Sequence, residues 1–156
     1  MGQSQELERA LGLAVLKLRE SASQDPGLVL IMLDADEDPA CVLGPDLLRR
    51  ARAYRSDADI SCVVAAVEYE TWFVAAAPSL TKFLDLSGGP SPESPESSRS
   101  GKAWVQQRFK GVKYSPKIAQ PSMTRQMDLR QARQRSPSFD KLCRELEKRM
   151  AEAAPA

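Results

Sequence analysis

The sequence predicts an α/β domain in which a small parallel sheet is flanked by helices. Two short, unbroken apolar runs, residues 28–33 and 60–67, are typical of strands buried on both faces. A helix start at Gly44-Pro45 lies between them. A strand, a helix and a second strand form a right-handed parallel crossover by default. The 156 residues suffice for one such domain with its own core.

Residues 4–20 carry apolar side chains at helical spacing (Leu7, Leu11, Val15 and Leu18) and predict an amphipathic helix capped by Ser4. Asp25-Pro26-Gly27 then predicts a turn before the first strand. We take residues 1–86 as the α/β core.

The rest of the chain is predicted to be helical around a polar segment. Residues 87–101, SGGPSPESPESSRSG, are of low complexity and predict a mobile loop or lid. Residues 102–150 are taken as a helical part of the same domain and residues 151–156 as a frayed tail. Short helices are expected at residues 69–77, 102–110 and 128–134, an irregular stretch at 110–122, and a last helix from Ser136 with the apolar stripe Phe139, Leu142, Cys143, Leu146 and Met150.

Acidic residues follow both predicted strands. Asp34 and Asp36 end the run LVLIMLDADEDP, and Glu68 and Glu70 follow the second run. Because the carboxyl ends of parallel strands meet at one edge, where α/β proteins bind ligands, these four carboxylates are expected to share one rim of the sheet. In extended backbone Asp34 and Asp36 would leave on the same face, roughly 6.6 Å apart along the strand.

Two carboxylates so placed repel each other, which favours a hard cation such as Mg²⁺ or Mn²⁺ between them. Two other interpretations stay open. Asp34 or Asp36 caps a turn, and Glu68 or Glu70 is an exposed first-turn acid favoured by the helix dipole.

Several classes of site are excluded or disfavoured by composition. The chain has no histidine, which excludes Ser–His–Asp and Cys–His nucleophiles and His-ligated zinc. Its three cysteines show no CxxC spacing, which argues against zinc and for a reducing, cytoplasmic location. No apolar run approaches the roughly 20 residues of a membrane span, so no membrane partner is expected.

Charge is unevenly distributed along the chain. Residues 1–60 hold seven Lys and Arg and eleven Asp and Glu, whereas residues 108–149 hold twelve and four, net charges of −4 and +8. This asymmetry fits a metal site beside a polyanion-binding surface, and it also fits an ordinary solvated helical surface.

Two strands are too few for an independently stable sheet, and both runs read as interior strands. The remaining strands are therefore expected from segments that the pattern misses, from another chain at an exposed sheet edge, as in a homo-oligomer, or from a segment N-terminal to Met1. The abrupt start in a helix favours the last.

Three segments resemble the domain-of-unknown-function 4276 family, Toprim-like proteins of which many are found in bacteria. They are LDADEDP, AVEYETWFVAA and YSPKIAQPSMTRQMDLRQARQRSPSFDKLCRELE, of which RSPSFDKLCRELE is the most specific. The resemblance covers nearly the whole chain outside residues 87–101. It implies a compact Toprim-like α/β unit in which a DxD holds Mg²⁺ and a glutamate after the first strand acts as general acid or base.

Carried over to this chain, Asp34 and Asp36 match the DxD, and Glu68 and Glu70 match acidic positions before the family's Trp. The implied catalytic set is these four residues, with Asp34, Asp36 and Glu68 as metal ligands. The relatives begin with a strand and a Val-Glu-Gly-like motif that carries the glutamate, and this sequence is expected to start after it.

Three functions follow as hypotheses. The first is a Mg²⁺-dependent nuclease, for example in bacterial defence, that binds nucleic acid through Lys113, Tyr114, Lys117, Gln120, Arg130, Arg133 and Arg135. The second is a haloacid-dehalogenase-like phosphatase with Asp34 as nucleophile, although Asp38 stands where Thr or Val is usual. The third is a non-catalytic regulatory or effector subunit of an ATPase partner.

Overall fold

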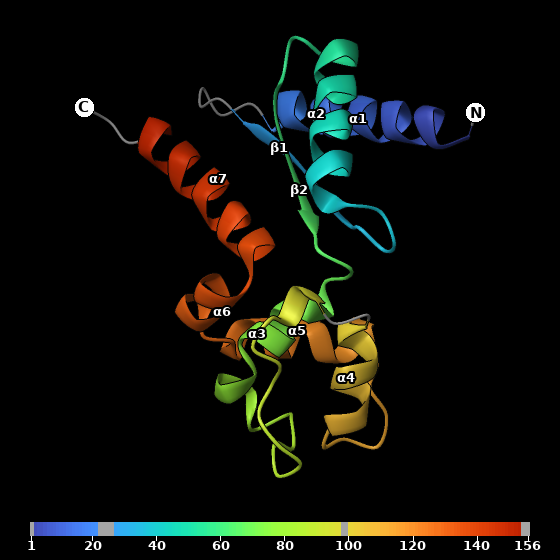
Figure 1. The fold of residues 1–156 in the computed structure, drawn as a ribbon. Coiled ribbons are helices and arrows are strands. Elements are labelled where there is room, and N and C mark those ends of the chain that lie inside the picture. Colours follow the sequence, from blue (N-terminus) through green and yellow to red (C-terminus); the bar gives the residue numbers. More distant parts are fainter. Residues whose placement is uncertain (1, 22–26, 98–99, 154–156) are drawn as a thin grey trace.

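The computed structural model describes residues 2–21, 27–97 and 100–153. The first half of the chain forms α1 (Gly2–Glu20), β1 (Leu28–Asp34), α2 (Ala40–Tyr54) and β2 (Asp59–Ala65). The second half forms α3 (Glu70–Ala75), α4 (Gly101–Arg108), α5 (Pro116–Gln126), α6 (Leu129–Arg135) and α7 (Pro137–Ala153), with 3-10 turns at Ala77–Leu80 and Pro95–Ser97. Figure 1 shows that α1, α2 and the strands form one part of the molecule and α3 to α6 the other.

The two strands of the described sheet are parallel neighbours, so the predicted α/β class is confirmed. They pair from Leu28 opposite Asp59 to Asp34 opposite Ala65. One face packs against α1 and α2, where small and branched side chains such as Val15, Ala51 and Ile60 are buried together. Because the strands are parallel, their carboxyl ends lie at the same end of the sheet, which faces the α3 to α6 part of the molecule (Figure 1).

A second core lies among the helices that follow β2. Trp72 and Phe73 of α3 are fully buried there, together with Met123 of α5. The indole of Trp72 lies 5.2 Å from the ring of Phe139, and its Nε1 donates to Ser138 Oγ at 2.8 Å. These contacts attach α7 to α3, and α7 then runs back along β2 (Figure 1).

Helix α2 begins at Ala40, four residues before the predicted start at Gly44-Pro45. The carbonyl of Pro39 accepts hydrogen bonds from the N–H groups of Val42 and Leu43, so the first turn closes there. Pro45 lies inside the helix, where its lack of an N–H removes one backbone hydrogen bond after the first turn. The prediction from proline chemistry was therefore wrong about the boundary.

Helix α5 lies where an irregular segment was predicted. It contains Pro116 in its first turn and Pro121 in its interior. Ala119 and Met123, four residues apart, are buried in the second core. Burial of this stripe outweighs the local cost of Pro121.

The segment expected to be a mobile loop is packed where the structure describes it. Ser91 and Pro95 are buried, and Glu96 Oε1 accepts hydrogen bonds from the N–H and the hydroxyl of Ser138 at 2.9 and 2.6 Å. This carboxylate lies at the first turn of α7, where the helix dipole favours negative charge. Residues 98–99 fall outside the described part of the chain.

Other boundaries differ less. Helix α1 begins at Gly2, so the backbone of Ser4 lies within it instead of at its cap. Helix α7 continues to Ala153, into the predicted frayed tail. The predicted turn at Asp25-Pro26-Gly27 lies mostly outside the described residues, as do residues 154–156. No helix in the described ranges is long and apolar enough to cross a membrane.

Candidate functional site

The loops that leave β1 and β2 are bonded to each other at the carboxyl ends of the strands. The N–H of Ala35 donates to the carbonyl of Ala65 at 2.9 Å, and the N–H of Asp36 donates to that of Val67 at 2.8 Å. Asp36 and Val67 both adopt left-handed backbone, with φ of 50° and 64°. Such conformations are uncommon for residues other than glycine, most of all for β-branched valine, and they collect at functional sites.

This geometry corrects one prediction. Strand β1 ends at Asp34, and Asp36 turns into left-handed backbone. The extended spacing that would place Asp34 and Asp36 on one face therefore does not continue to Asp36. Both residues still lie at the carboxyl end of β1, but strand alternation no longer sets the relative direction of their side chains.

Asp34 is a rim carboxylate whose pKa is shifted by its surroundings. Its pKa is raised above the usual value of 3.8, first by burial and then by the neighbouring carboxylates of Glu70, Asp36 and Glu68. A hydrogen bond from the N–H of Tyr69 to Asp34 Oδ1, 2.8 Å long, acts in the opposite direction and lowers the pKa. Asp34 thus holds the start of α3 and also lies within the field of three other acids.

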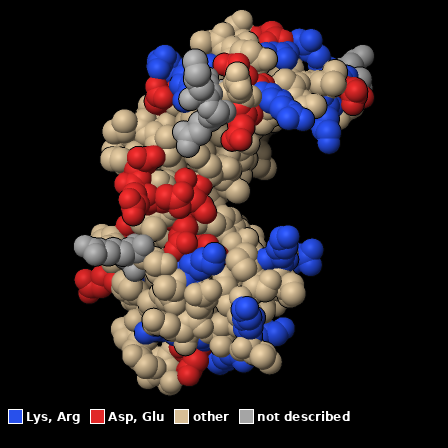
Figure 2. Space-filling view, turned by 90° about the vertical axis from the view of Figure 1, so that its right-hand side faces the viewer, with Lys and Arg blue, Asp and Glu red and all other residues tan. Residues whose placement is uncertain are grey.

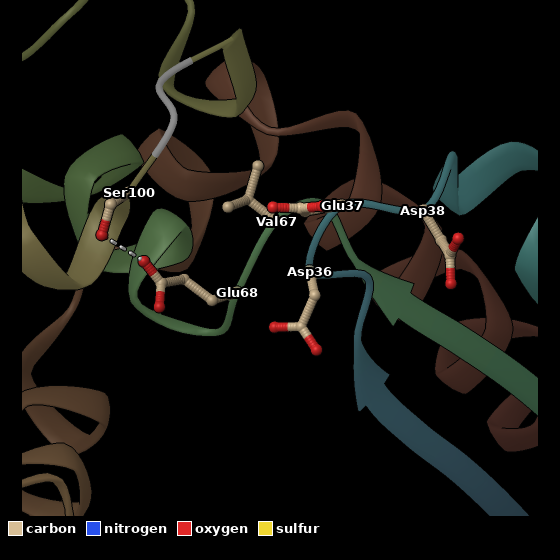
Figure 3. Close-up of a pocket in the computed structure, with 6 residues that line it drawn as sticks. All are labelled: Asp36, Glu37, Asp38, Val67, Glu68 and Ser100. Carbon is tan, nitrogen blue, oxygen red and sulfur yellow. Dashed lines mark hydrogen bonds between the residues drawn. The ribbon is translucent and has the colours of Figure 1, made fainter. Parts of the chain in front are cut away.

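Glu68 caps a helix that is distant in sequence. Its Oε1 accepts a hydrogen bond from the hydroxyl of Ser100 at 2.9 Å and one from the N–H of Lys102 at 2.7 Å. Ser100 is the N-cap residue of α4, and the carboxylate completes that cap. In Figure 3 the side chain of Glu68 extends toward Ser100 and away from Asp36.

Glu70 is buried, with 4% of its surface exposed. The hydroxyl of Tyr114 and the side-chain amide of Gln120 both donate to its Oε1, at 2.9 and 3.1 Å. Burial and the nearby Glu70 carboxylate raise the pKa of the Tyr114 phenol, so the phenol stays protonated and donates its hydrogen. Glu70 therefore ties α5 and the segment before it to α3.

A hollow of about 570 Å³ opens at this rim and is lined by Asp36, Glu37, Asp38, Val67, Glu68 and Ser100 (Figure 3). Figure 2 shows acidic side chains gathered at the waist of the molecule, between its two parts. The labelled carboxylates in Figure 3 fan out and do not converge on one point. Accordingly, no three His, Cys, Asp or Glu side chains in the described ranges are grouped so as to hold a metal ion.

The residues predicted to bind nucleic acid do not form one surface. Tyr114 and Gln120 bond Glu70. Arg133 pairs with Glu147 and, at 2.6 Å, with Asp140. Arg135 donates to the carbonyl of Ala75 at 2.9 Å and to Ser91 Oγ at 2.8 Å, and so holds the segment before α4. The other three predicted residues, Lys113, Lys117 and Arg130, are exposed.

Sequence reasoning missed the residues that hold the rim together. Ser100 was hidden in the low-complexity segment, although a serine just before a helix is an N-cap signal. Val67 was placed in the second strand, but the strand ends at Ala65. Nothing in the local pattern marks Val67 as left-handed.

The parallel strand pair, the helices on its faces and the carboxylates at its ends define a mixed α/β protein with an acidic rim. The chain belongs to the family described as a domain of unknown function (DUF4276), whose sequence model matches residues 4–147. No curated protein and no solved structure matched the chain.

Proposed function

We propose that the chain is a Toprim-like, metal-dependent phosphodiesterase that acts on nucleic acid, with Mg²⁺ or Mn²⁺ bound at Asp34 and Asp36. One observation carries the proposal: the carboxylate of Asp34, at the exposed carboxyl end of β1, lies in the field of Glu70, Asp36 and Glu68, and its pKa is raised. Carboxylates gathered at one rim repel each other, and a divalent cation bound between them would reduce that repulsion. The left-handed backbone at Asp36 and Val67 supports a functional origin for this rim.

The donor set suits a hard cation, since carboxylate oxygens are the ligands that Mg²⁺ and Mn²⁺ prefer. Mg²⁺ is commonly held by one or two carboxylates and completes its shell with waters and substrate phosphate. Asp34 and Asp36 supply the number and kind of protein ligands that this mode requires, and no third His, Cys, Asp or Glu in the described residues is grouped with them. The third predicted ligand, Glu68, serves α4 instead.

When bound, such an ion supplies Lewis-acid polarisation of a phosphate and a water of lowered pKa. The chain contributes orientation: the N–H of Tyr69 fixes one oxygen of Asp34, and Tyr114 and Gln120 hold Glu70 beside it. The hydrogen bonds that position these acids are therefore present before any ligand arrives.

Calorimetric titration with Mn²⁺ and Mg²⁺ tests the site directly. The unaltered chain should bind Mn²⁺, Asp34→Asn should lose that binding, and Asp46→Asn should keep it, because Asp46 lies on α2 paired with Arg49 and Arg50. Metal-dependent cleavage of supercoiled DNA, abolished by Asp34→Ala, would establish the activity. Absence of uptake by the unaltered chain would remove the proposal, and a phosphate trapped on Asp34 would support a phosphatase instead.

A second candidate is a non-catalytic subunit of an ATPase partner. It is favoured by the structural use of Glu68 and Glu70, each of which already accepts two hydrogen bonds from its own chain. Co-purification of a partner protein by a chain that neither binds Mn²⁺ nor cleaves DNA would select this function.

A further inference from the structure

The stretch between Glu96 and Asp128 has an unusual charge. It contains seven Lys and Arg residues and no Asp or Glu. Within it, residues 110–118, here called the lysine segment, present Lys110, Lys113 and Lys117 to solvent. Two aliphatic side chains stand among them: Val112 is fully exposed and Ile118 is 77% exposed.

A fourth lysine lies next to this segment. The N–H of Lys110 donates to the carbonyl of Phe83 at 2.8 Å, and Lys110 Nζ donates to that of Thr81 at 2.7 Å. Lys82, which lies between those two residues, is exposed. These two bonds place Lys82 beside Lys110, on the segment that also carries Lys113 and Lys117. Asp85 also lies near Lys110, so it offsets part of the positive charge at that end of the segment.

The lysine segment is anchored from inside. Tyr114, in its middle, is buried and donates to Glu70. Its ring also lies 5.5 Å from the ring of Phe109, edge to face. Gly111 lies so close to Phe109 that a Cβ there would come within 2.4 Å of the ring. The exposed side chains are therefore presented by a backbone held on both sides of Val112.

The anchor also fixes where this surface lies. Tyr114 follows Lys113 directly and reaches the buried carboxylate of Glu70, which in turn contributes to the raised pKa of Asp34. Tyr114 thus links the lysine segment to the acidic rim. A polyanion held by the lysines would lie beside a rim that repels it in the absence of a cation.

We propose that the lysine segment and Lys82 bind the phosphate backbone of a nucleic acid, with Val112 and Ile118 in contact with its sugars or bases. The proposal rests on the proposed function in naming nucleic acid as the polyanion. Four lysines around two aliphatic side chains form a mainly electrostatic surface, as expected for backbone contacts. A lipid anchor would present more apolar and aromatic area than these two side chains supply.

The test is fluorescence anisotropy with a labelled duplex oligonucleotide in EDTA, across a range of salt concentrations. EDTA removes any contribution of a metal at the rim. The double variant Lys113→Gln/Lys117→Gln should weaken binding about tenfold and reduce the slope of log affinity against log salt by about 2, one contact for each lysine lost. Val112→Ser should weaken binding severalfold and leave the slope unchanged.

The matched control is Lys17→Gln/Lys148→Gln, which makes the same change in net charge on α1 and α7. It should leave affinity and salt slope close to those of the unaltered chain. Equal weakening by both double variants would overturn the proposal, because only net charge would then matter. The proposal would also be overturned if the chain bound phosphatidylserine vesicles but not the oligonucleotide, and if Val112→Ser abolished that vesicle binding.

Failure of the proposed activity remains separate from failure of this surface. Asp34→Asn removes the predicted metal site but not a lysine, and it should bind the oligonucleotide at least as tightly as the unaltered chain. Oligonucleotide binding without cleavage would support the surface and count against the phosphodiesterase. Cleavage that survives Lys113→Gln/Lys117→Gln with unchanged affinity would count against the surface alone.

Discussion

Asp34 is costly to the folded state because of where it lies. Burial and the carboxylates of Glu70, Asp36 and Glu68 raise its pKa, so ionising it is harder in the folded chain than in the unfolded one. An acid with a raised folded pKa reduces stability above that pKa. The reduction fades as pH falls and is absent below the unfolded value, near 3.8.

Asp34→Asn should therefore raise the melting temperature at neutral pH by only about 1–2 °C, because solvent screens this exposed carboxylate. An amide oxygen at this position still accepts the N–H of Tyr69 and carries no charge. The gain should shrink as pH is lowered toward 4. Thermal denaturation between pH 4 and pH 8 measures both effects. Asp34→Ala serves as control, because it removes the hydrogen bond together with the charge. A gain that is constant with pH would contradict this account of Asp34.

Tyr114→Phe should destabilise the fold by about 1.5–3 kcal/mol, because it leaves the buried carboxylate of Glu70 with one donor fewer. Urea unfolding followed by circular dichroism measures the change. Tyr54→Phe is the matched control, since Tyr54 is an exposed residue at the end of α2 and should change stability little. Equal effects of the two substitutions would show that the bond to Glu70 adds nothing.

At the scale of elements, α3 and α4 pack backbone against backbone. Gly101 begins α4, and a Cβ built there would lie 2.6 Å from the backbone nitrogen of Thr71 and 2.9 Å from its Cα. The neighbouring cap, formed by Ser100 and Glu68, holds the same end of α4. The position of α4 thus depends on the lack of a side chain at Gly101 and on the carboxylate of Glu68.

Gly101→Ala should cost about 3 kcal/mol, the upper end for overpacking, because the atoms it meets are backbone atoms and cannot rotate away. Gly12→Ala is the matched control. It adds a methyl group in the helix α1 where nothing lies within 4 Å, and it should stabilise the chain by about 0.5–1 kcal/mol. Chemical denaturation of both variants gives the comparison, and a neutral Gly101→Ala would refute the close packing of α3 and α4.

Glu68→Ala should loosen the start of α4 at a cost of about 1 kcal/mol. Amide hydrogen exchange should quicken at Lys102, which loses its acceptor, and the amides of α5 should exchange as before. Glu68→Gln keeps an acceptor oxygen and should have a smaller effect. Exchange at Lys102 unaltered by Glu68→Ala would argue that the carboxylate is available for a cation.

Strand β2 was predictable because burial on both faces leaves a continuous apolar run, which does not depend on knowing the partner. Strand β1 has the same kind of run, but in β1 only Val29 is buried and Met32 is 49% exposed, so the predicted burial on both faces was wrong for β1. Helix α5 was not predictable from local chemistry, since Pro116 and Pro121 disfavour it and only the burial of Ala119 and Met123 reverses that preference. The rim was predictable as a place, because strand ends follow from strand pairing. Its hydrogen bonds were not, since the Ser100 partner of Glu68 lies 32 residues away and the Tyr114 partner of Glu70 lies 44 residues away.

Across the whole molecule, α7 joins the strand-bearing part to the α3 to α6 part. Its first turns pack Phe139 against Trp72. Farther along, Glu145 accepts from Ser61 Oγ at 2.9 Å, and Arg149 pairs with Asp59 at 3.0 Å. Loss of α7 packing should therefore destabilise both the strand-bearing part and the α3 to α6 part.

We expect the chain to unfold in one transition, with tryptophan fluorescence and far-ultraviolet circular dichroism changing together. Both tryptophans, Trp72 and Trp104, belong to helices beyond the strands, so fluorescence reports on that part alone. Phe139→Ala should lower the free energy of unfolding by about 3–5 kcal/mol, and it should shift the urea midpoints of both signals by the same amount. A fluorescence transition at lower urea than the dichroism transition would show that the two parts unfold independently.

The hydrogen bond between Asp36 and Val67 has a consequence for how this family can change over time. Val67 has a left-handed backbone that its β-branched side chain disfavours, whereas Asp36 has one that aspartate tolerates, and the hydrogen bond between them joins the two loops. A relative that replaces one of them with a more permissive residue would free the opposite loop to drift. We therefore expect these two positions to vary as a pair among members of the family, although 30 residues of chain lie between them.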